Sequence, residues 1–260
     1  MWRTPMSTPL SHINTGLTER ELRCELAAAF RLGDRFGWTE LVWNHITARV
    51  PQEPDHFLIN PMGLRWDEIS ASKLIKVDAD GNVIEGDGEV PKAGYVIHSA
   101  VHEARPDVVA CMHTHTNDGI AVSALRDGLQ PLCHEALYFH DNIGYHDCEG
   151  ASMDVDERSR IQASLGAHQA LILRNHGLLT AGGSIGEAFT LMYWLQRACE
   201  VQMKVLASNV DWQSIPTSIA ERFAKQRDQP RDSSEAFRPG QYEWPALVRQ
   251  LDAGDPSFRD

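Results

Sequence analysis

The sequence lacks the features of secreted, membrane-spanning and nucleic-acid-binding proteins. Its five cysteines are odd in number and contain no Cys-x-x-Cys pair, which predicts free thiols in a reducing compartment. No apolar run approaches the roughly 20 residues that span a bilayer, and the N-terminus has no signal-peptide pattern. Acidic residues outnumber basic ones by 36 to 24, which argues against a nucleic-acid partner, since such a partner requires a basic stripe. We therefore expect a cytoplasmic protein that binds neither membranes nor nucleic acids.

The hydrophobic pattern predicts one α/β domain over residues 18–208. A capping box at Thr18–Glu21 begins a helix that runs to about Phe36. Strands are expected over 41–50, 57–61, 73–78 and 107–115. A short strand at 83–86 is expected to form a hairpin with 73–78, and two more short strands lie within 170–183. Helices are expected over 94–107, 117–125, 133–140, 154–166 and 184–207. Residues 1–17 read as an arm, and 209–260 as a polar tail that either covers a neighbouring subunit or frays.

Twelve histidines are present, and three of them suggest a metal site. His113 and His115 alternate along a predicted buried strand, so both side chains point to the same side of the sheet. His176 lies in the predicted turn between two short strands, where Gly177 permits a tight bend. A His-x-His pair alone is weak, because most such histidines are ordinary surface or core residues. Three histidines with an open position are nevertheless typical of a catalytic metal centre.

Several segments, in order, resemble the class II aldolase/adducin family. They are WNHITARV (43–50), LINPMGLRWDEIS (58–70), VDADGNVIEG (77–86), EVPKAGYVIHSAVHEARPD (89–107), the overlapping RPDVVACMHTH (105–115), and LILRNHGLLTAG (171–182). The resemblance implies a three-layer α/β/α sandwich around a mixed, mostly antiparallel sheet, and a homotetramer with active sites near subunit interfaces. It also implies that His113, His115 and His176 bind a divalent metal, with zinc the usual ion and iron or manganese as alternatives.

The departures from that family pattern bear on the substrate. Sugar-phosphate aldolases of the family carry a glutamate, acting as base, where this chain has Gly94. Their phosphate-binding pairs correspond to Trp43-Asn44, Met62-Gly63 and Lys92-Ala93, which offer fewer hydroxyl and backbone donors. Sugar phosphates are therefore not the expected substrates, although Asn44, Gly63, Lys92 and His98 stay candidates for substrate binding. The adducin-like branch of the family fits better.

Another group must then handle the proton. The candidates are Glu89, His98, His134, Glu135 and Tyr138, among which Glu135, His134 and Glu89 are the predicted catalytic residues. Each has an ordinary alternative: Glu89 as a solvated loop charge, and His98 or His102 as helix-packing residues. Cys111, Trp66 and Trp43 are read as packing residues, and Arg174 as either a carboxylate ligand or a surface ion-pair partner.

Three functions remain open on this sequence. The first is a metal-dependent carbon–carbon lyase, an aldolase or decarboxylase, acting on a small hydroxy- or keto-acid. The second is a non-haem iron oxygenase on the same three histidines. The third is a non-catalytic adducin-like interaction module of the actin-cytoskeleton type, although adducin-type proteins carry a long extension with a basic end that this acidic tail does not resemble.

Overall fold

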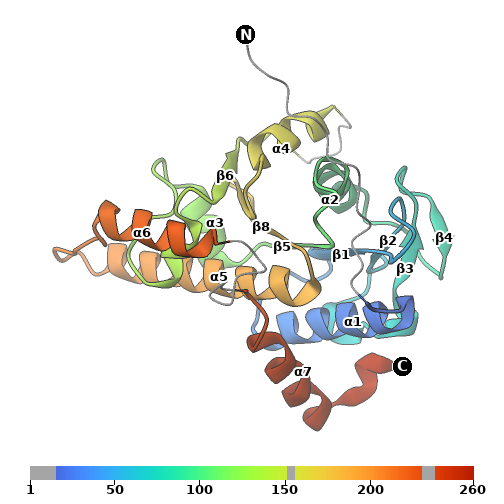
Figure 1. Cartoon of the computed structure of the whole chain (residues 1–260). Coiled ribbons are helices and arrows are strands. Elements are labelled where there is room, and N and C mark those ends of the chain that lie inside the picture. The colour runs from blue at the N-terminus through green and yellow to red at the C-terminus, as the bar shows by residue number, and fades with distance from the viewer. Residues whose placement is uncertain (1–15, 151–155, 230–237) are drawn as a thin grey trace.

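A single eight-stranded sheet organises the chain in a computed structural model that describes residues 16–150, 156–229 and 238–260 (Figure 1). Its strand order is β4-β3-β2-β1-β5-β8-β7-β6, and all neighbours are antiparallel except β6 and β7. The strands are β1 His45–Arg49, β2 Phe57–Ile59, β3 Ile75–Val77, β4 Val83–Glu85, β5 Ala110–Thr114, β6 Ile143–His146, β7 Ala170–Leu173 and β8 Gly177–Gly182. The predicted mixed, mostly antiparallel sheet is confirmed.

Helices cover both faces of this sheet and complete the predicted three layers (Figure 1). The α-helices are α1 Glu19–Arg35, α2 Lys92–Ala104, α3 Asn117–Ser123, α4 Glu157–Leu165, α5 Ile185–Ala207, α6 Thr217–Arg227 and α7 Glu243–Gly254. Short 3-10 helices are η1 Trp66–Glu68, η2 Ala71–Lys73, η3 Glu135–Phe139 and η4 Pro256–Arg259. Helices α1 and α5 share one hydrophobic cluster with the sheet, while α2 and α4 share another on the opposite face.

Alternation along β5 decides which layer each side chain enters. Ala110 and Met112 pack into the cluster with α1 and α5, whereas Cys111 packs into the cluster with α2 and α4. His113 has the parity of Cys111 and therefore lies on the α2 side. Cys111 is fully buried in the sheet, as its interpretation as a packing residue requires.

Between residues 18 and 208, the local predictions differ most from the structure at three places. The helix from Thr18 begins with the expected capping box, but the strand predicted from residue 41 begins only at His45. Leu41 has a left-handed backbone with φ of 51°, and the Trp43 amide donates to the Glu40 carbonyl, so this stretch is a turn. The predicted helix over 133–140 is a 3-10 helix, and the parallel edge strand β6 had not been predicted.

The C-terminal residues from 238 onward pack against the first helix. Leu251 and Phe258 are each only 1% exposed and belong to the α1–α5 cluster. The Trp244 indole donates to Glu25 of α1 at 2.9 Å, and the Asp260 carbonyl accepts from the Ser72 amide at 2.8 Å. These contacts make the described C-terminal segment part of the layer formed by α1. Within the described residues, no helix combines the length and the apolar character needed to cross a membrane.

Candidate metal centre

The three predicted histidines meet at one end of the central strands. His115 follows β5 directly, and His176 precedes β8 in the turn from β7. Asn175 supports this turn in a left-handed conformation with φ of 57°, a conformation that asparagine tolerates better than most residues. A Cβ atom on Gly177 would lie 2.4 Å from the Thr114 carbonyl oxygen, so only glycine lets β8 approach β5 this closely.

The nitrogen atoms of these histidines converge as ligands of one ion would. One nitrogen from each of His113, His115 and His176 lies within 4.8 Å of the other two. The ring centroids are 4.6 to 4.9 Å apart, and the Nε2 atoms of His113 and His115 are separated by 2.7 Å. The structure thus brings together three residues that are 63 positions apart at their extremes (His113 to His176).

The outer nitrogens of two of these rings are held by oxygen acceptors. Nδ1 of His113 donates to the Leu178 carbonyl at 2.9 Å, and Nδ1 of His115 donates to the Glu40 carboxylate at 2.6 Å. In a neutral imidazole the other nitrogen then carries a lone pair. Two lone pairs therefore face each other across 2.7 Å, an arrangement that a shared cation stabilises. The donor set fits a divalent metal.

Burial lowers the pKa of two of the ligand histidines, His113 and His176. Desolvation, reinforced by the neighbouring His115, lowers the pKa of His176 to about 4. The same two causes hold the pKa of His113 well below its ordinary value. Metal ions bind the unprotonated nitrogen, so both side chains are ready to bind at neutral pH without first losing a proton.

Glu40 was not among the residues predicted from the sequence, yet it orients His115. The Asn44 side-chain oxygen accepts from the Glu40 amide at 2.8 Å and thereby fixes the turn that presents the carboxylate. Asn44, predicted as a substrate-binding residue, thus holds the turn whose Glu40 carboxylate binds His115. The only hint in the sequence was the position of Glu40, four residues before an asparagine already singled out.

Replacing Glu40 by alanine is expected to weaken metal binding by roughly 10–100-fold, because His115 loses the acceptor that fixes its ring. Competition with a chromophoric zinc chelator measures this change. Glu40→Gln retains an acceptor oxygen and should lose less affinity than Glu40→Ala. Equal affinities of Glu40→Ala and the unaltered protein would contradict the orienting role.

His45 is a second residue that the sequence reasoning missed. It pairs with His113 across β1 and β5, and its ring lies against the backbone of Gly94 in α2. A Cβ atom at Gly94 would lie only 1.9 Å from His45 Cδ2. The imidazole therefore fills the space where a side chain at position 94 would begin, which accounts physically for the glycine there.

His98, predicted to bind substrate, is fully buried beside the centre. Its Nδ1 atom and the Nε2 atom of His102 both hydrogen-bond to the Thr47 hydroxyl, at 2.9 and 2.8 Å. The ring centroids of His98 and His113 are 6.4 Å apart. His102 lies farther along α2 than His98, and its ring stacks on Phe57 of β2. It therefore lies deeper in the packing between α2 and the sheet.

These buried histidines predict a loss of stability in mild acid. Desolvation lowers the folded-state pKa to about 4 for His45 and about 3 for His102, below the ordinary value of 6.5. As the pH falls from 7 to 5 the unfolded chain binds protons that the folded chain does not. The free energy of unfolding should then fall by about 2 kcal/mol per such histidine.

Urea denaturation of chelator-treated protein at pH 7 and pH 5 checks this expectation. His102→Leu should reduce the difference between the two pH values by about 2 kcal/mol, because one proton-binding group is removed from the unfolded state. An unchanged difference in His102→Leu would show that His102 does not lose its proton on folding.

The predicted acid–base residues Glu135 and His134 lie against helices α5 and α6. Glu135 accepts from Arg197 of α5 at 2.8 Å, and the His134 ring packs edge-on to Phe223 of α6. Partial burial raises the pKa of Glu135, but its own backbone amide and Arg197 outweigh this effect and leave it lowered. Hydrogen bonds and ring contacts of the described residues join neither side chain to the three histidines.

The remaining predicted site residues lie on the rim around the N-terminus of α2. Glu89 is exposed on the loop after β4, and its carbonyl accepts from the Met62 amide. Lys92 is the exposed first residue of α2, and Gly63 occupies a turn with φ of 92°. Glu89, Lys92 and Gly63 therefore all lie in the segments between β2 and Gly94.

Of the other residues considered in the sequence analysis, Trp66 packs in the core and Arg174 binds backbone groups, whereas Trp43 is exposed. Trp66 is buried edge-on against Phe30, whereas Trp43 is 52% exposed. Arg174 stacks on the Tyr145 ring at 4.5 Å and donates to the carbonyl groups of residues 125 and 126. Arg174 thus has structural partners already.

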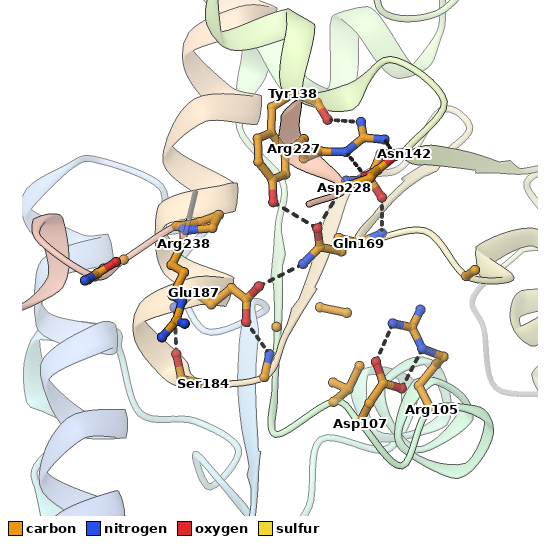
Figure 2. Close-up of a pocket in the computed structure, with 18 of the residues that line it drawn as sticks. Arg105, Asp107, Tyr138, Asn142, Gln169, Ser184, Glu187, Arg227, Asp228 and Arg238 are labelled. Atoms are coloured by element: carbon orange, nitrogen blue, oxygen red, sulfur yellow. Dashed lines mark hydrogen bonds and ion pairs between the residues drawn. The ribbon is translucent and has the colours of Figure 1, made fainter. Parts of the chain in front are cut away.

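A large cavity of about 490 Å³ lies at the opposite end of the strands (Figure 2). It is lined by Val108, which precedes β5, and by Gly182, which ends β8, whereas the histidines lie at the other ends of both strands. Gln169 forms its centre: its side chain accepts from Tyr138 and Asn142 and donates to Glu187 at 2.9 Å. Of the buried side-chain polar atoms left without a partner among the described residues, none lines this cavity.

An α/β/α sandwich with three convergent histidines at one end of its sheet defines the class II aldolase type of protein. The family described as "Class II Aldolase and Adducin N-terminal domain" matches residues 24–203. The chain belongs to the class II aldolase/adducin family.

Relatives of several kinds share the fold. An aldolase class 2-like protein of Pseudomonas aeruginosa is 46% identical over 244 residues, covering 93% of each chain. Mouse alpha-adducin is 42% identical over 90% of this chain, but the match spans only 33% of that protein. Among solved structures, an aldolase II superfamily protein of Pseudomonas syringae has 39% identity and a TM-score of 0.86, over 96% of this chain and all of that one. An L-fuculose 1-phosphate aldolase of Glaciozyma antarctica has 28% identity and a TM-score of 0.81, over 99% and 97%.

Proposed function

We propose that this protein is a divalent-metal-dependent lyase, an aldolase or decarboxylase, acting on a small hydroxy- or keto-acid. The observation that carries the proposal is the pair of Nε2 atoms of His113 and His115 facing each other at 2.7 Å, with both Nδ1 atoms held by oxygen acceptors. His113, His115 and His176 would hold the ion. A divalent ion there supplies Lewis-acid polarisation of a carbonyl oxygen, which both carbon–carbon cleavage and decarboxylation require.

Zinc is the ion we propose first, since three neutral imidazoles with an open position suit it; iron(II) and manganese are the alternatives. We further propose a cytoplasmic homotetramer, a state that sedimentation or light scattering of the purified protein will check.

The residues around α2 favour a substrate without a phosphate group. Ala93 offers no hydroxyl where the sugar-phosphate enzymes have one, and Gly94 offers no carboxylate. Lys92 is a single exposed cation and can attract the carboxylate of a hydroxy- or keto-acid. L-fuculose 1-phosphate, named for the Glaciozyma relative, is thus a comparison substrate on which we expect little turnover.

Proton transfer is proposed for Glu135, His134 or Glu89. Glu135 and His134 would act from the α5–α6 side, and Glu89 from the loop before α2. Glu135→Gln that binds metal normally but has lost turnover would support Glu135 in this role, and a fully active Glu135→Gln would remove it.

Elemental analysis of protein purified without chelator or a metal-affinity tag tests the function, followed by turnover assays with small hydroxy- and keto-acids. About one zinc or similar non-redox ion per chain, with release of an aldehyde or carbon dioxide, is the expected result. Iron, with oxygen consumption instead, would favour an oxygenase. Absence of any ion after soaking in zinc salts would overturn the proposal.

The similarity to alpha-adducin favours a second candidate, an interaction module without turnover. The match covers nearly all of this chain but one third of that protein, so any partner contacts would have to use surfaces of the shared domain. Co-sedimentation with filamentous actin tests this candidate. Binding that survives removal of the metal, together with no turnover, would favour it over the lyase.

A further inference from the structure

The cavity at the other end of the strands has the size and the lining of a second binding site (Figure 2). Its walls come from the residues that follow α2, from the end of α6 and from the first turn of α5. Val108, Ala167 and Ala181 add a small apolar surface. A volume of about 490 Å³ suits a small organic molecule. The chemistry of its polar residues therefore decides which molecule it can bind.

The first of two similar ion pairs in this lining is that of Arg105 and Asp107 (Figure 2). The Nη1 atom of Arg105 donates to the carbonyl groups of Gly166 and His168, at 3.2 and 2.9 Å. Its Nε and Nη2 atoms donate to the Asp107 carboxylate at 2.8 and 2.7 Å. The backbone thus fixes the guanidinium, and one edge of it faces a carboxylate.

Arg227, the last residue of α6, repeats this pattern with Asp228. Its Nη1 atom donates to the carbonyl groups of Tyr138 and His140, at 2.8 and 2.6 Å. Its Nε and Nη2 atoms donate to the Asp228 carboxylate at 2.7 and 3.0 Å. Among the described residues, Arg227 therefore uses four of its five N–H groups, and one hydrogen on Nη2 is left for another acceptor.

The Arg227–Asp228 pair offers a charged donor and a charged acceptor side by side. A carboxylate has about four lone-pair sites, and the guanidinium takes two of them on Asp228. The side chain of Arg227 is 7% exposed, against 17% for Arg105, so water screens a contact to Arg227 less. The side chain of Asp228 is 63% exposed, which leaves its carboxylate accessible from solvent.

The balance of charge in the lining selects the chemical class of the ligand. The cavity is lined by three arginines and three carboxylates: Arg105, Arg227, Arg238, Asp107, Glu187 and Asp228. A dianion would leave the negative charges in excess, and a buried charge without a partner is costly. A zwitterion adds one charge of each sign and keeps the balance. An α-amino acid carries a carboxylate and an ammonium group on one carbon, which matches a donor and an acceptor that lie side by side.

We propose that this cavity binds a free α-amino acid, with its carboxylate on Arg227 and its ammonium group on Asp228. The apolar surface of Val108, Ala167 and Ala181 receives a short aliphatic side chain. The site goes beyond the lyase proposal and does not depend on it, because it lies at the opposite end of the strands and uses none of the three histidines.

Calorimetric titration of the full chain with L-valine and three analogues tests this site. Isovalerate lacks the ammonium group of valine, isobutylamine lacks its carboxylate, and glutarate is a dianion. Valine should bind with a Kd near or below about 1 mM. Each analogue should bind about 10–100-fold more weakly, because one hydrogen bond to a charged group contributes a factor of that size. Zinc-loaded and chelator-treated protein should bind valine equally.

Asp228→Asn removes the charge that holds the ammonium group but keeps an oxygen acceptor for Arg227. It should weaken valine binding about 10–100-fold and leave isovalerate no weaker than before. Asp252→Asn is the matched control, since Asp252 forms the same two-bond pair with Arg259 outside this cavity. It should keep the full affinity for valine. Thermal unfolding checks that both variants fold.

Four results would overturn the assignment. Equal affinity for valine and isovalerate would mean that the cavity recognises a carboxylate alone, and tighter binding of glutarate would mean that it selects a dianion. Absence of valine binding, or undiminished binding in Asp228→Asn, would also contradict it. None of these results bears on the metal centre, because elemental analysis and turnover assays test that centre separately.

Discussion

Alanine at His113 is expected to empty the three-histidine centre while the chain remains folded. Removal of groups that merely orient metal ligands lowers affinity roughly 10–100-fold, so removal of a ligand itself should cost more than about a hundredfold. The α/β/α sandwich has extensive clusters on both faces of its sheet and does not depend on an ion to form a core. Zinc content after gel filtration, together with circular dichroism, measures both effects.

His140→Ala serves as the control for this experiment, because His140 lies after η3 and faces Asp141 instead of the centre. It should retain the full metal content. Unfolding of His113→Ala in the presence of zinc would mean that the ion has a structural role, and retention of zinc by that variant would exclude His113 as a ligand.

Alanine at Gly94 is expected to destabilise the protein, although alanine normally stabilises a helix. In the interior of a helix the change from glycine favours folding by about 1 kcal/mol. Here the new methyl group would lie 1.9 Å from the His45 ring, and α2 or β1 must shift. Overpacking of this kind costs about 1–3 kcal/mol, so after the helical gain we expect a net loss of about 1 kcal/mol in urea denaturation.

The double variant Gly94→Ala, His45→Ala tests the cause of that loss. Without the imidazole the methyl group has room, so the Gly94 change should become neutral or stabilising in the His45→Ala background. Gly254→Ala, at the end of α7, is the matched control: a Cβ atom there would meet only the flexible guanidinium of Arg35 at the end of α1, and the effect should stay within about 1 kcal/mol. Equal losses in both backgrounds would show that His45 is not the obstacle.

Most strands and helices could be predicted because periodicity records burial on each of them, whereas the three layers were implied by the resemblance to the class II aldolase/adducin family. The capping box at Thr18 and the apolar run before His113 each specify local structure with nearby residues. The edge strand β6 escaped prediction because its four residues alternate between buried and half-buried positions and include a glycine. Its pairing with β7 depends on a parallel neighbour 27 residues away, which no local pattern reveals.

The candidate site was predictable to the extent that motifs lie on regular elements. The His-x-His spacing on a strand and the glycine-bounded turn at His176 are local properties, and both follow from backbone geometry. Glu40 and His45 were missed because their roles arise from contacts across the sheet and between layers.

The packing of Phe258 and Arg259 against α1 has a consequence for how the chain reaches its final state. Cys24 of α1 contacts the Arg259 carbonyl across 235 positions, so α1 is synthesised long before the segment that covers it. Until then the apolar side of α1 that Leu251 and Phe258 cover remains open to other proteins. Nascent chains halted before residue 256 should therefore be more prone to aggregation and more dependent on chaperones than chains that extend through residue 260.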